Sequence, residues 1–481
     1  MTATTAPPVG LAPAPASRPH TGRNVELLLL VLALAIPLAA WAYVGLTIQG
    51  EVPPDLVRYA AGLGVLFLLA HLAVRFFAPY ADPLMLPVVA LLNGLGLVMI
   101  HRLDLAATEN ARGAGRALPR ADAPVQLLWT TIGVALFLVV LLLVRDHRSL
   151  QRYTYTALVA GIGLLLLPLL PGIGREINGA RIWISLGGLS FQPGEIAKLV
   201  LIIFFAGYLV LKRDALAVAG RRVLGLDLPR ARDLGPILVG WAVSLAILVF
   251  QRDLGTSLLF FGAFVSLLYV ATERRFWMVL GVLLVGGGGY VAYQLFAHVR
   301  TRVDIWLDPF ADPDNRGYQL VQSLYSFANG GLTGTGLGLG RPDLVPYAKT
   351  DFIVSAFGEE LGLTGLMALL LLYGVLVERG LRAALSVRDG FGTLLATGLS
   401  IIFALQIFVV VGGVSRLIPL TGLTTPFLSY GGSSLVANYA LLALLLRISD
   451  AARRPAPATS APARVRSDSP TEVVRTDGVQ A

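Results

Sequence analysis

The chain has 481 residues, of which 56% are hydrophobic and only 14% are charged, and its mean hydropathy is +0.73. Soluble domains carry about 25% charged residues, so the composition excludes an ordinary soluble protein and indicates an integral membrane protein. The chain has no cysteine, which excludes disulfides, thiolate metal sites and cysteine nucleophiles. The net charge of +9 indicates nucleic-acid binding only if it is not explained by membrane topology.

Twelve apolar stretches approach or reach the roughly 20 residues that a helix needs to cross a bilayer. Their runs are continuously apolar and rich in leucine, whereas the strands of a membrane β-barrel alternate. The sequence therefore predicts an all-α membrane protein with about twelve transmembrane helices. In chain order the stretches are 25–46, 57–77, 84–101, 125–144, 153–170, 197–211, 234–250, 255–272, 276–297, 352–377, 391–413 and 431–446.

The first stretch could be mistaken for a signal peptide, because Ala40 and Ala42 form an A-x-A pattern. Its apolar run is longer than the core of a usual signal peptide, so we expect it to be retained as a transmembrane helix.

Basic residues gather in alternate loops, which fixes an expected orientation. The positive-inside rule makes these loops cytoplasmic, and an even number of spans places both termini on the same side. The basic charge then reports topology and contact with anionic lipid, not nucleic-acid binding. The loops run from Arg145 to Arg152, from Lys212 to Arg232, over Arg274 and Arg275, and from Arg379 to Arg388.

The expected organisation has four parts. Two tails rich in Pro, Ala, Ser and Thr are predicted to be disordered and cytoplasmic. Two N-terminal helices precede the main membrane domain, which contains one large outer loop. The ranges are 1–24 and 450–481 for the tails, 25–77 for the two helices, 84–447 for the membrane domain and 298–351 for the loop.

The outer loop contains several aspartates and aromatic residues, which argue against simple disorder in so long a connection. Its glycine run, GLTGTGLGLG at 331–340, lacks the GK[ST] and the strand–helix context of a phosphate-binding loop. We therefore expect a glycine turn between short re-entrant or interfacial helices.

Ionisable residues at membrane depth are candidates for function. In FQPGEIAK at 191–198, the residues Gln192, Glu195 and Lys198 recur on one helical face, and Glu195 and Lys198 are spaced to form an ion pair. The pair either fixes helix packing or lines a polar cavity at the outer leaflet.

A second polar stripe lies in TDFIVSAFGEELG at 350–362, where Asp351, Ser355 and Glu359 recur every four residues. Asp351 is either a carboxylate favoured by the helix start or a catalytic group. Asp253, in a short turn between two spans, fits a helix cap as well as it fits a catalyst.

Six ordered segments resemble the signatures of the SEDS family, named for shape, elongation, division and sporulation. The resemblance covers about 84–447 and is closest to the RodA elongation branch in its long actinobacterial form. Residues 25–77 would be two helices beyond the family's usual ten. The segments are NGARIWISLGGLSFQPGEIAKL, QRDLGTSLL, LDPFADPDNRGYQLVQSL, GGLTGTGLGLG, TDFIVSAFGEELGLTG and RLIPLTGLTTPFLSYGGSSL.

The resemblance implies a peptidoglycan glycosyltransferase that polymerises lipid II, an undecaprenyl-diphosphate-linked disaccharide pentapeptide, at the outer face of the cytoplasmic membrane. It also implies a class B penicillin-binding protein as transpeptidase partner, together with other proteins of the elongation complex. The family's essential aspartate corresponds to Asp351, and further motif positions correspond to Glu195, Lys198 and Asp253. The family's GA-x-RWI reads GARIWI at 179–184, which displaces the arginine to Arg181.

The chemistry leads to the same residues. A diphosphate-linked sugar already carries a good leaving group, so one base for the acceptor hydroxyl and positive charge for the departing diphosphate suffice. Asp351 is the expected base, with a pKa raised by desolvation, and Asp253, Glu195 and Lys198 are the other predicted catalytic residues. No resident metal is assigned, but a divalent cation (Mg²⁺ or Mn²⁺) held by acids could assist. The predicted substrate-binding residues are Gln192, Arg181, Lys349, Ser355, Glu359 and Arg416.

Two alternatives remain open from the residues. A flippase for lipid-linked precursors would bind its substrate at the midplane between internal repeats; no convincing repeat is found, although GGGG at 286–289 could act as a hinge. A noncatalytic scaffold for wall-synthesis enzymes would not need a buried carboxylate stripe.

Overall fold

The computed structural model describes residues 21–455 except 178–179, 187–188, 218–220, 224–225 and 229–230, and 21–453 form one compact unit. In this described part, eleven helices are long and apolar enough to cross a membrane, which confirms a multi-pass helical membrane protein. They comprise α1 (Arg23–Gln49), α2 (Leu56–Phe77), α3 (Met85–Gly113), α4 (Ala123–Leu143), α5 (Thr154–Leu166, extended by the 3₁₀ turns η1, His147–Tyr153, and η2, Leu167–Leu169), α6 (Pro193–Ala217), α8 (Leu254–Thr272), α9 (Phe276–Leu295), α12 (Ile353–Ser386), α13 (Gly390–Val414) and α14 (Gly432–Arg453).

The one remaining predicted span, 234–250, corresponds to α7 (Ala231–Phe250), in which the described apolar part, Leu238–Ile247, is shorter than a span. The predicted tails lie outside the described residues, except for 21–24 and 450–455.

Helix α3 is longer than its apolar run, which ends near residue 101. The helix continues to Gly113, because His101, Arg102 and Asp104 are buried against other parts of the protein and do not have to face lipid. This extension carries α3 into the region of the outer loop.

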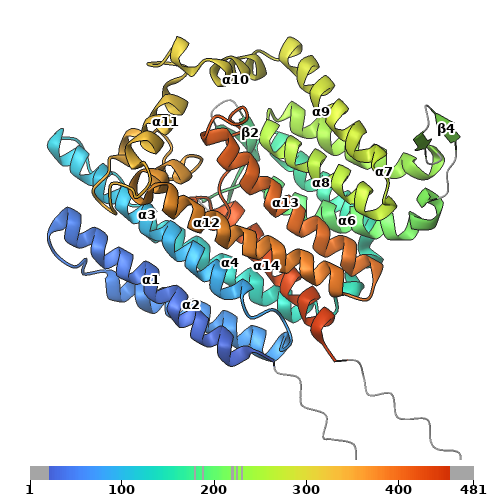
Figure 1. Cartoon of the computed structure of the whole chain (residues 1–481), viewed down its shortest axis with the longest axis horizontal. Coiled ribbons are helices and arrows are strands. Elements are labelled where there is room, and N and C mark those ends of the chain that lie inside the picture. Colours follow the sequence, from blue (N-terminus) through green and yellow to red (C-terminus); the bar gives the residue numbers. More distant parts are fainter. Residues whose placement is uncertain are drawn as a thin grey trace, which may run out of the picture. The chain divides into compact units, whose positions relative to one another are not determined.

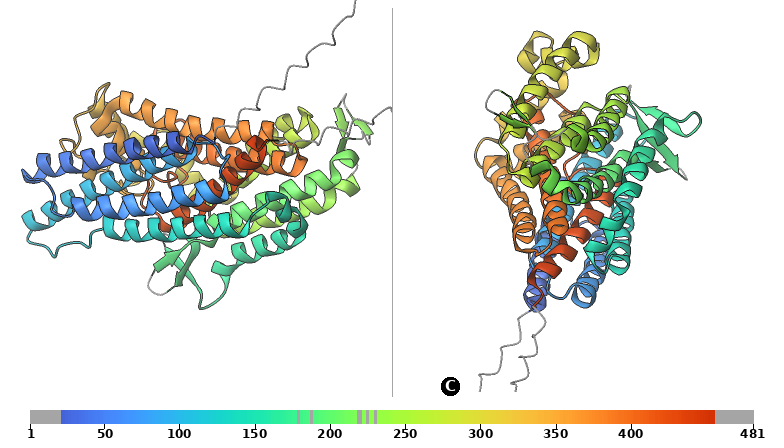
Figure 2. Two further views of the ribbon diagram at one scale, coloured as in Figure 1. Left: turned by 90° about the horizontal axis from the view of Figure 1, so that it is seen from below. Right: turned by 90° about the vertical axis from the view of Figure 1, so that its right-hand side faces the viewer.

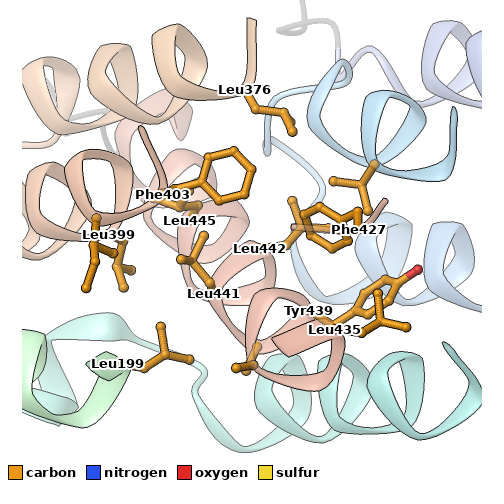
Figure 3. Packing of buried hydrophobic residues seen from close by; sticks show 14 of the residues in the cluster. Leu199, Leu376, Leu399, Phe403, Phe427, Leu435, Tyr439, Leu441, Leu442 and Leu445 are labelled. Atoms are coloured by element: carbon orange, nitrogen blue, oxygen red, sulfur yellow. The ribbon is translucent and has the colours of Figure 1, made fainter. Parts of the chain in front are cut away.

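Helix α14 is the central helix of the bundle and packs on α4, α6, α12 and α13. Figure 3 shows its side chains among aromatic rings of the neighbouring segments; the rings of Phe427 and Tyr439 meet edge to face with centroids 5.4 Å apart. Gly133 lets α4 approach Tyr439 of α14 closely, since a Cβ at this position would lie 2.5 Å from the Tyr439 ring. Small residues at such contacts let helices in a membrane pack closely.

The two N-terminal helices form a hairpin that packs along the main bundle, with α1 on α3 and α2 on α4 (Figure 1). Pro37 of α1 fills the space above Gly94 of α3. Nearer the outer end, the ring of Trp41 stacks on that of His101 with centroids 3.9 Å apart. The hairpin is therefore packed against the bundle over much of its length.

A small antiparallel sheet between α5 and α6 was not predicted from the sequence. Its strands are β1 (Gly174–Ile177), β2 (Ala180–Leu186) and β3 (Leu189–Phe191), in the order β1-β2-β3, and Figure 2 shows them beside the helices. Ile184 pairs with Phe191, so the sheet ends directly before Gln192. A second pair, β4 (Arg221–Val223) and β5 (Leu226–Leu228), lies between α6 and α7.

The outer loop contains two short helices, α10 (Ala297–Leu307) and α11 (Tyr318–Gly330), and the 3₁₀ turns η3 (Pro309–Ala311) and η4 (Pro342–Leu344). The glycine run follows α11 as the predicted turn.

This glycine run docks on a break in α12. Gly362 has a non-helical backbone (φ 67°, ψ −170°), a conformation that favours glycine. The break leaves the carbonyls of Glu359 and Glu360 to accept backbone hydrogen bonds from Thr335 (2.9 Å) and Gly336 (3.0 Å). The run is therefore part of the packed structure.

Candidate active site

Asp351 lies two residues before α12 begins, at the end of the long loop that we predicted to be extracytoplasmic. Burial raises the pKa of its carboxyl to about 6, against the attraction of the Arg302 guanidinium and a hydrogen bond with Thr350. A carboxylate with this pKa is ionised near neutrality and can still accept a proton, as a general base must.

Arg302, on α10, is the cation facing this carboxylate. Its Nη1 donates to the carbonyls of Leu420 (3.1 Å) and Thr421 (3.0 Å). Burial lowers its pKa, while Asp253 and Asp351 act in the opposite direction. Sequence reasoning missed Arg302, because it precedes the recognised signature in the loop and lies among several other charged residues.

Asp253 caps α8. Its Oδ1 accepts the backbone N–H of Thr256 at 3.0 Å, and its Oδ2 lies 3.4 Å from Nε2 of Gln192. Burial raises the pKa of Asp253, Glu195 adds to the rise, and Arg302 opposes it. The structure thus brings four predicted site residues (Asp351, Asp253, Gln192 and Glu195) and Arg302 into one polar region, with Asp253 in the capping role.

Glu195 and Lys198 form the expected ion pair at the start of α6, with Oε2 and Nζ 2.6 Å apart. Both are buried. Lys198 also donates to Oε1 of Gln406 on α13 (2.8 Å), and Gln406 donates to the carbonyl of Thr424 (2.9 Å). The pair therefore joins α6 to α13 and to the loop that borders Asp351.

Lys349 was predicted to bind substrate, but the structure gives it protein partners. Its Nζ donates to Asp104 (2.5 Å) and Asp122 (2.8 Å); burial would lower its pKa, and these hydrogen bonds outweigh that effect and raise it. The Lys349 carbonyl accepts the N–H of Tyr430 at 2.7 Å. Lys349 is therefore placed to hold the segment that carries Asp351.

Ser355 and Glu359, also predicted to bind substrate, are buried and bonded within the protein. Ser355 shares a hydrogen bond of 2.6 Å with Ser323 of α11. Glu359 accepts from the hydroxyl of Ser326 (2.6 Å) and the N–H of Arg341 (2.7 Å). The polar stripe of α12 faces α11 and the outer loop, and these two residues hold that loop in place.

The remaining two predicted cations lie apart from these contacts. Arg416 is exposed and caps the end of α10: its Nε donates to the carbonyl of Trp306 (2.9 Å) and its Nη2 to that of Leu307 (2.5 Å). Arg181 is half-buried in β2.

The described residues contain no group of three His, Asp or Glu side chains that could hold a metal ion. An assisting Mg²⁺ or Mn²⁺ held by acids stays a prediction of the sequence.

Comparison with known proteins identifies the family. A family profile described as "Cell cycle protein", comprising FtsW, RodA and SpoVE, matches residues 83–454. The chain belongs to this family. It is 57% identical over 436 residues to the peptidoglycan glycosyltransferase RodA of Mycobacterium tuberculosis (strain ATCC 25618 / H37Rv), covering 90% of this chain and 92% of that protein. The RodA of Mycobacterium leprae is 52% identical over 440 residues, with the same shares.

More distant members of the FtsW, RodA and SpoVE family align with a smaller share of this chain. A probable peptidoglycan glycosyltransferase FtsW of Geobacter metallireducens is 34% identical over 371 residues, which are 76% of this chain and 94% of that one. The alignments with the mycobacterial proteins are longer than the family match and the whole C-terminal tail taken together. They therefore also include part of the N-terminal hairpin.

Solved structures of the family share the fold. One, from a study of how a peptidoglycan synthase complex coordinates polymerization and crosslinking, has a TM-score of 0.59 and 29% identity and covers 77% of this chain and 97% of that one. The Thermus thermophilus rod shape determining protein RodA has a TM-score of 0.52 and 28% identity, with 78% and 98% covered.

Proposed function

We propose that this chain is a peptidoglycan glycosyltransferase that polymerises lipid II during cell elongation, with Asp351 as the general base. The observation that carries the proposal is the carboxyl of Asp351, with its pKa of about 6, at the outer start of a membrane-spanning helix. Membership of the FtsW, RodA and SpoVE family and the names of the mycobacterial relatives support it.

The reaction needs little covalent chemistry from the protein. Ionised Asp351 accepts the proton of the acceptor sugar hydroxyl, the hydroxyl oxygen forms a bond to the anomeric carbon of the donor, and the bond from that carbon to the diphosphate breaks. Because the diphosphate leaves with the bonding electrons, no paired general acid is needed, unlike in glycoside hydrolysis.

We infer the orientation from the charged loops: by the positive-inside rule, both termini would lie in the cytoplasm and the outer loop outside. We place the protein in the cytoplasmic membrane on this basis. The long prenyl chain of lipid II would stay in the bilayer while its diphosphate and sugars reach Asp351 at the outer boundary.

The partner that we propose is a class B penicillin-binding protein, which would cross-link the peptides of the new strands. The support is the similar solved structure, which comes from a complex described as coordinating polymerization and crosslinking.

The test is polymerisation of purified lipid II by the full-length protein, reconstituted with its transpeptidase, with glycan products resolved on gels. Asp351→Asn keeps the size of the side chain but removes its basicity, and should lower the rate about 10²–10⁴-fold. Asp314→Asn is a matched control, since Asp314 is exposed in the same loop, and should polymerise normally. Wild-type activity in a folded Asp351→Asn protein would exclude Asp351 as the base.

A further inference from the structure

We propose that Arg302 binds the diphosphate of the lipid-linked donor and neutralises the charge that develops on it as it leaves. This inference rests on the proposed function and adds to it the residue that meets the leaving group.

The side chains of Arg302 and Asp351 both lie next to the exposed backbone of Gly422. Gly422 has a positive φ of 73° and is exposed. A Cβ at this position would lie 3.7 Å from Oδ2 of Asp351 and 3.9 Å from Nη2 of Arg302, and these are its nearest neighbours within 4 Å. A ligand group lying over Gly422 would therefore be within contact distance of both the base and the guanidinium.

The guanidinium is oriented before any ligand binds. Its Nη1 is held by the carbonyls of residues 420 and 421, while Nη2 lies beside Gly422. The end of α10 is fixed in turn, because Arg416 donates to the carbonyls of Trp306 and Leu307, and Trp306 donates back to the carbonyl of Arg416 (3.1 Å). Donors that are fixed in advance stabilise developing charge most effectively.

Other basic residues near the site are already engaged. Lys198 lies against Glu195 and Gln406, and Lys349 against two carboxylates. Arg302 differs: within the described part of the chain no carboxylate lies within the 4.0 Å of a salt bridge to it, although both Asp253 and Asp351 are near enough to stabilise its charge. Its positive charge is available for a phosphate.

The step balances in atoms and charge. As the acceptor oxygen bonds to the anomeric carbon, the bond from that carbon to the diphosphate oxygen breaks and both electrons go to the diphosphate. The guanidinium of Arg302 meets this added negative charge by hydrogen bonding, and it neither gains nor loses a proton. Arginine suits this role because its fork of N–H donors matches phosphate oxygens.

The experiment compares Arg302→Gln, Arg302→Lys and Arg300→Gln in lipid II polymerisation by the full-length protein, with inorganic diphosphate as a competing ligand at constant Mg²⁺. We expect Arg302→Gln to lower kcat about 10²–10³-fold and to weaken inhibition by diphosphate at least about tenfold. Arg302→Lys should lie between it and the wild type. Arg300 is the control on the same helix; it is exposed and donates to the carbonyls of Tyr293 and Gln294, so Arg300→Gln should behave as wild type.

Binding of diphosphate is also measured by calorimetry on the Asp351→Asn protein, in which turnover should be lowered about 10²–10⁴-fold. Asp351→Asn should bind diphosphate, and the double variant with Arg302→Gln should not. The inference is overturned if the folded Arg302→Gln protein polymerises at the wild-type rate, or if diphosphate affects the wild type and Arg302→Gln equally, including no effect on either. A wild-type protein that does not polymerise lipid II would instead overturn the proposed function.

Discussion

The ammonium group of Lys349 lies 2.5 Å from the carboxylate of Asp104. Lys349 is two residues before Asp351 in the chain, whereas Asp104 belongs to α3. Its neighbour on α3, Arg102, bonds to Glu360 (2.5 Å) and to the carbonyl of Gly340 (2.6 Å). One turn of α3 thus holds the outer loop at two points, before Asp351 and beside the glycine run. The proposed base is positioned by a helix far from it in the sequence.

Lys349→Met should therefore impair catalysis through position. It removes the cation between Asp104 and Asp122 and leaves the buried Asp104 carboxylate without that partner, at a cost of about 1–3 kcal/mol in the free energy of unfolding. We expect a lower Tm and a polymerisation rate reduced about tenfold or more. Lys349→Arg keeps the charge and should recover part of both. An unchanged rate in Lys349→Met would show that the clamp does not position Asp351.

The pKa of Asp351 predicts an acid limb in the pH profile. Burial raises this pKa from 3.8 to about 6, so the carboxyl is mostly protonated, and inactive as a base, below that pH. Polymerisation rates should fall about tenfold per pH unit below about 6, measured across the neutral and weakly acidic range with stability monitored in parallel. His298 also titrates near the site and interacts with Arg302, but His298→Gln should keep the limb. A limb near pH 4 would contradict the assignment.

The Glu195–Lys198 pair predicts non-additive stability. Removing one partner leaves an uncompensated buried charge, so Glu195→Gln and Lys198→Met should each cost about 3–5 kcal/mol, and the double variant should cost less than their sum. Arg382→Met is the control, since the Arg382–Glu378 pair is exposed and should contribute less than about 1 kcal/mol. Strict additivity in thermal unfolding would show that the two residues do not interact.

The orientation can be tested directly because the chain has no cysteine. A cysteine introduced at Ala311, exposed in the outer loop, should react with a membrane-impermeant thiol reagent in intact cells. A cysteine at Arg388, exposed between α12 and α13, should react only after lysis. The reverse pattern would invert the topology and move the proposed site to the cytoplasm.

The spans could be predicted from the sequence because a bilayer demands continuous apolar runs, and the helical spacing of Glu195 and Lys198 was enough to predict their pairing. The partners of the second stripe were not accessible in this way. Ser355 and Glu359 have the expected spacing, but both form hydrogen bonds with residues of other segments. Their partners are Ser323, Ser326 and Arg341. Arg302 and the clamp on Lys349 also depend on contacts distant in sequence, which periodicity does not encode.

The N-terminal hairpin also contacts the glycine run of the outer loop. The hydroxyl of Thr47 lies 3.4 Å from the carbonyl of Leu337 in the glycine run, and a Cβ at Gly338 would lie 2.3 Å from that hydroxyl. In any relative that begins at the equivalent of α3, this face of the glycine run would have lipid or water as its neighbour. A substitution of Thr47 would thus disturb the glycine run only in chains that carry the N-terminal hairpin.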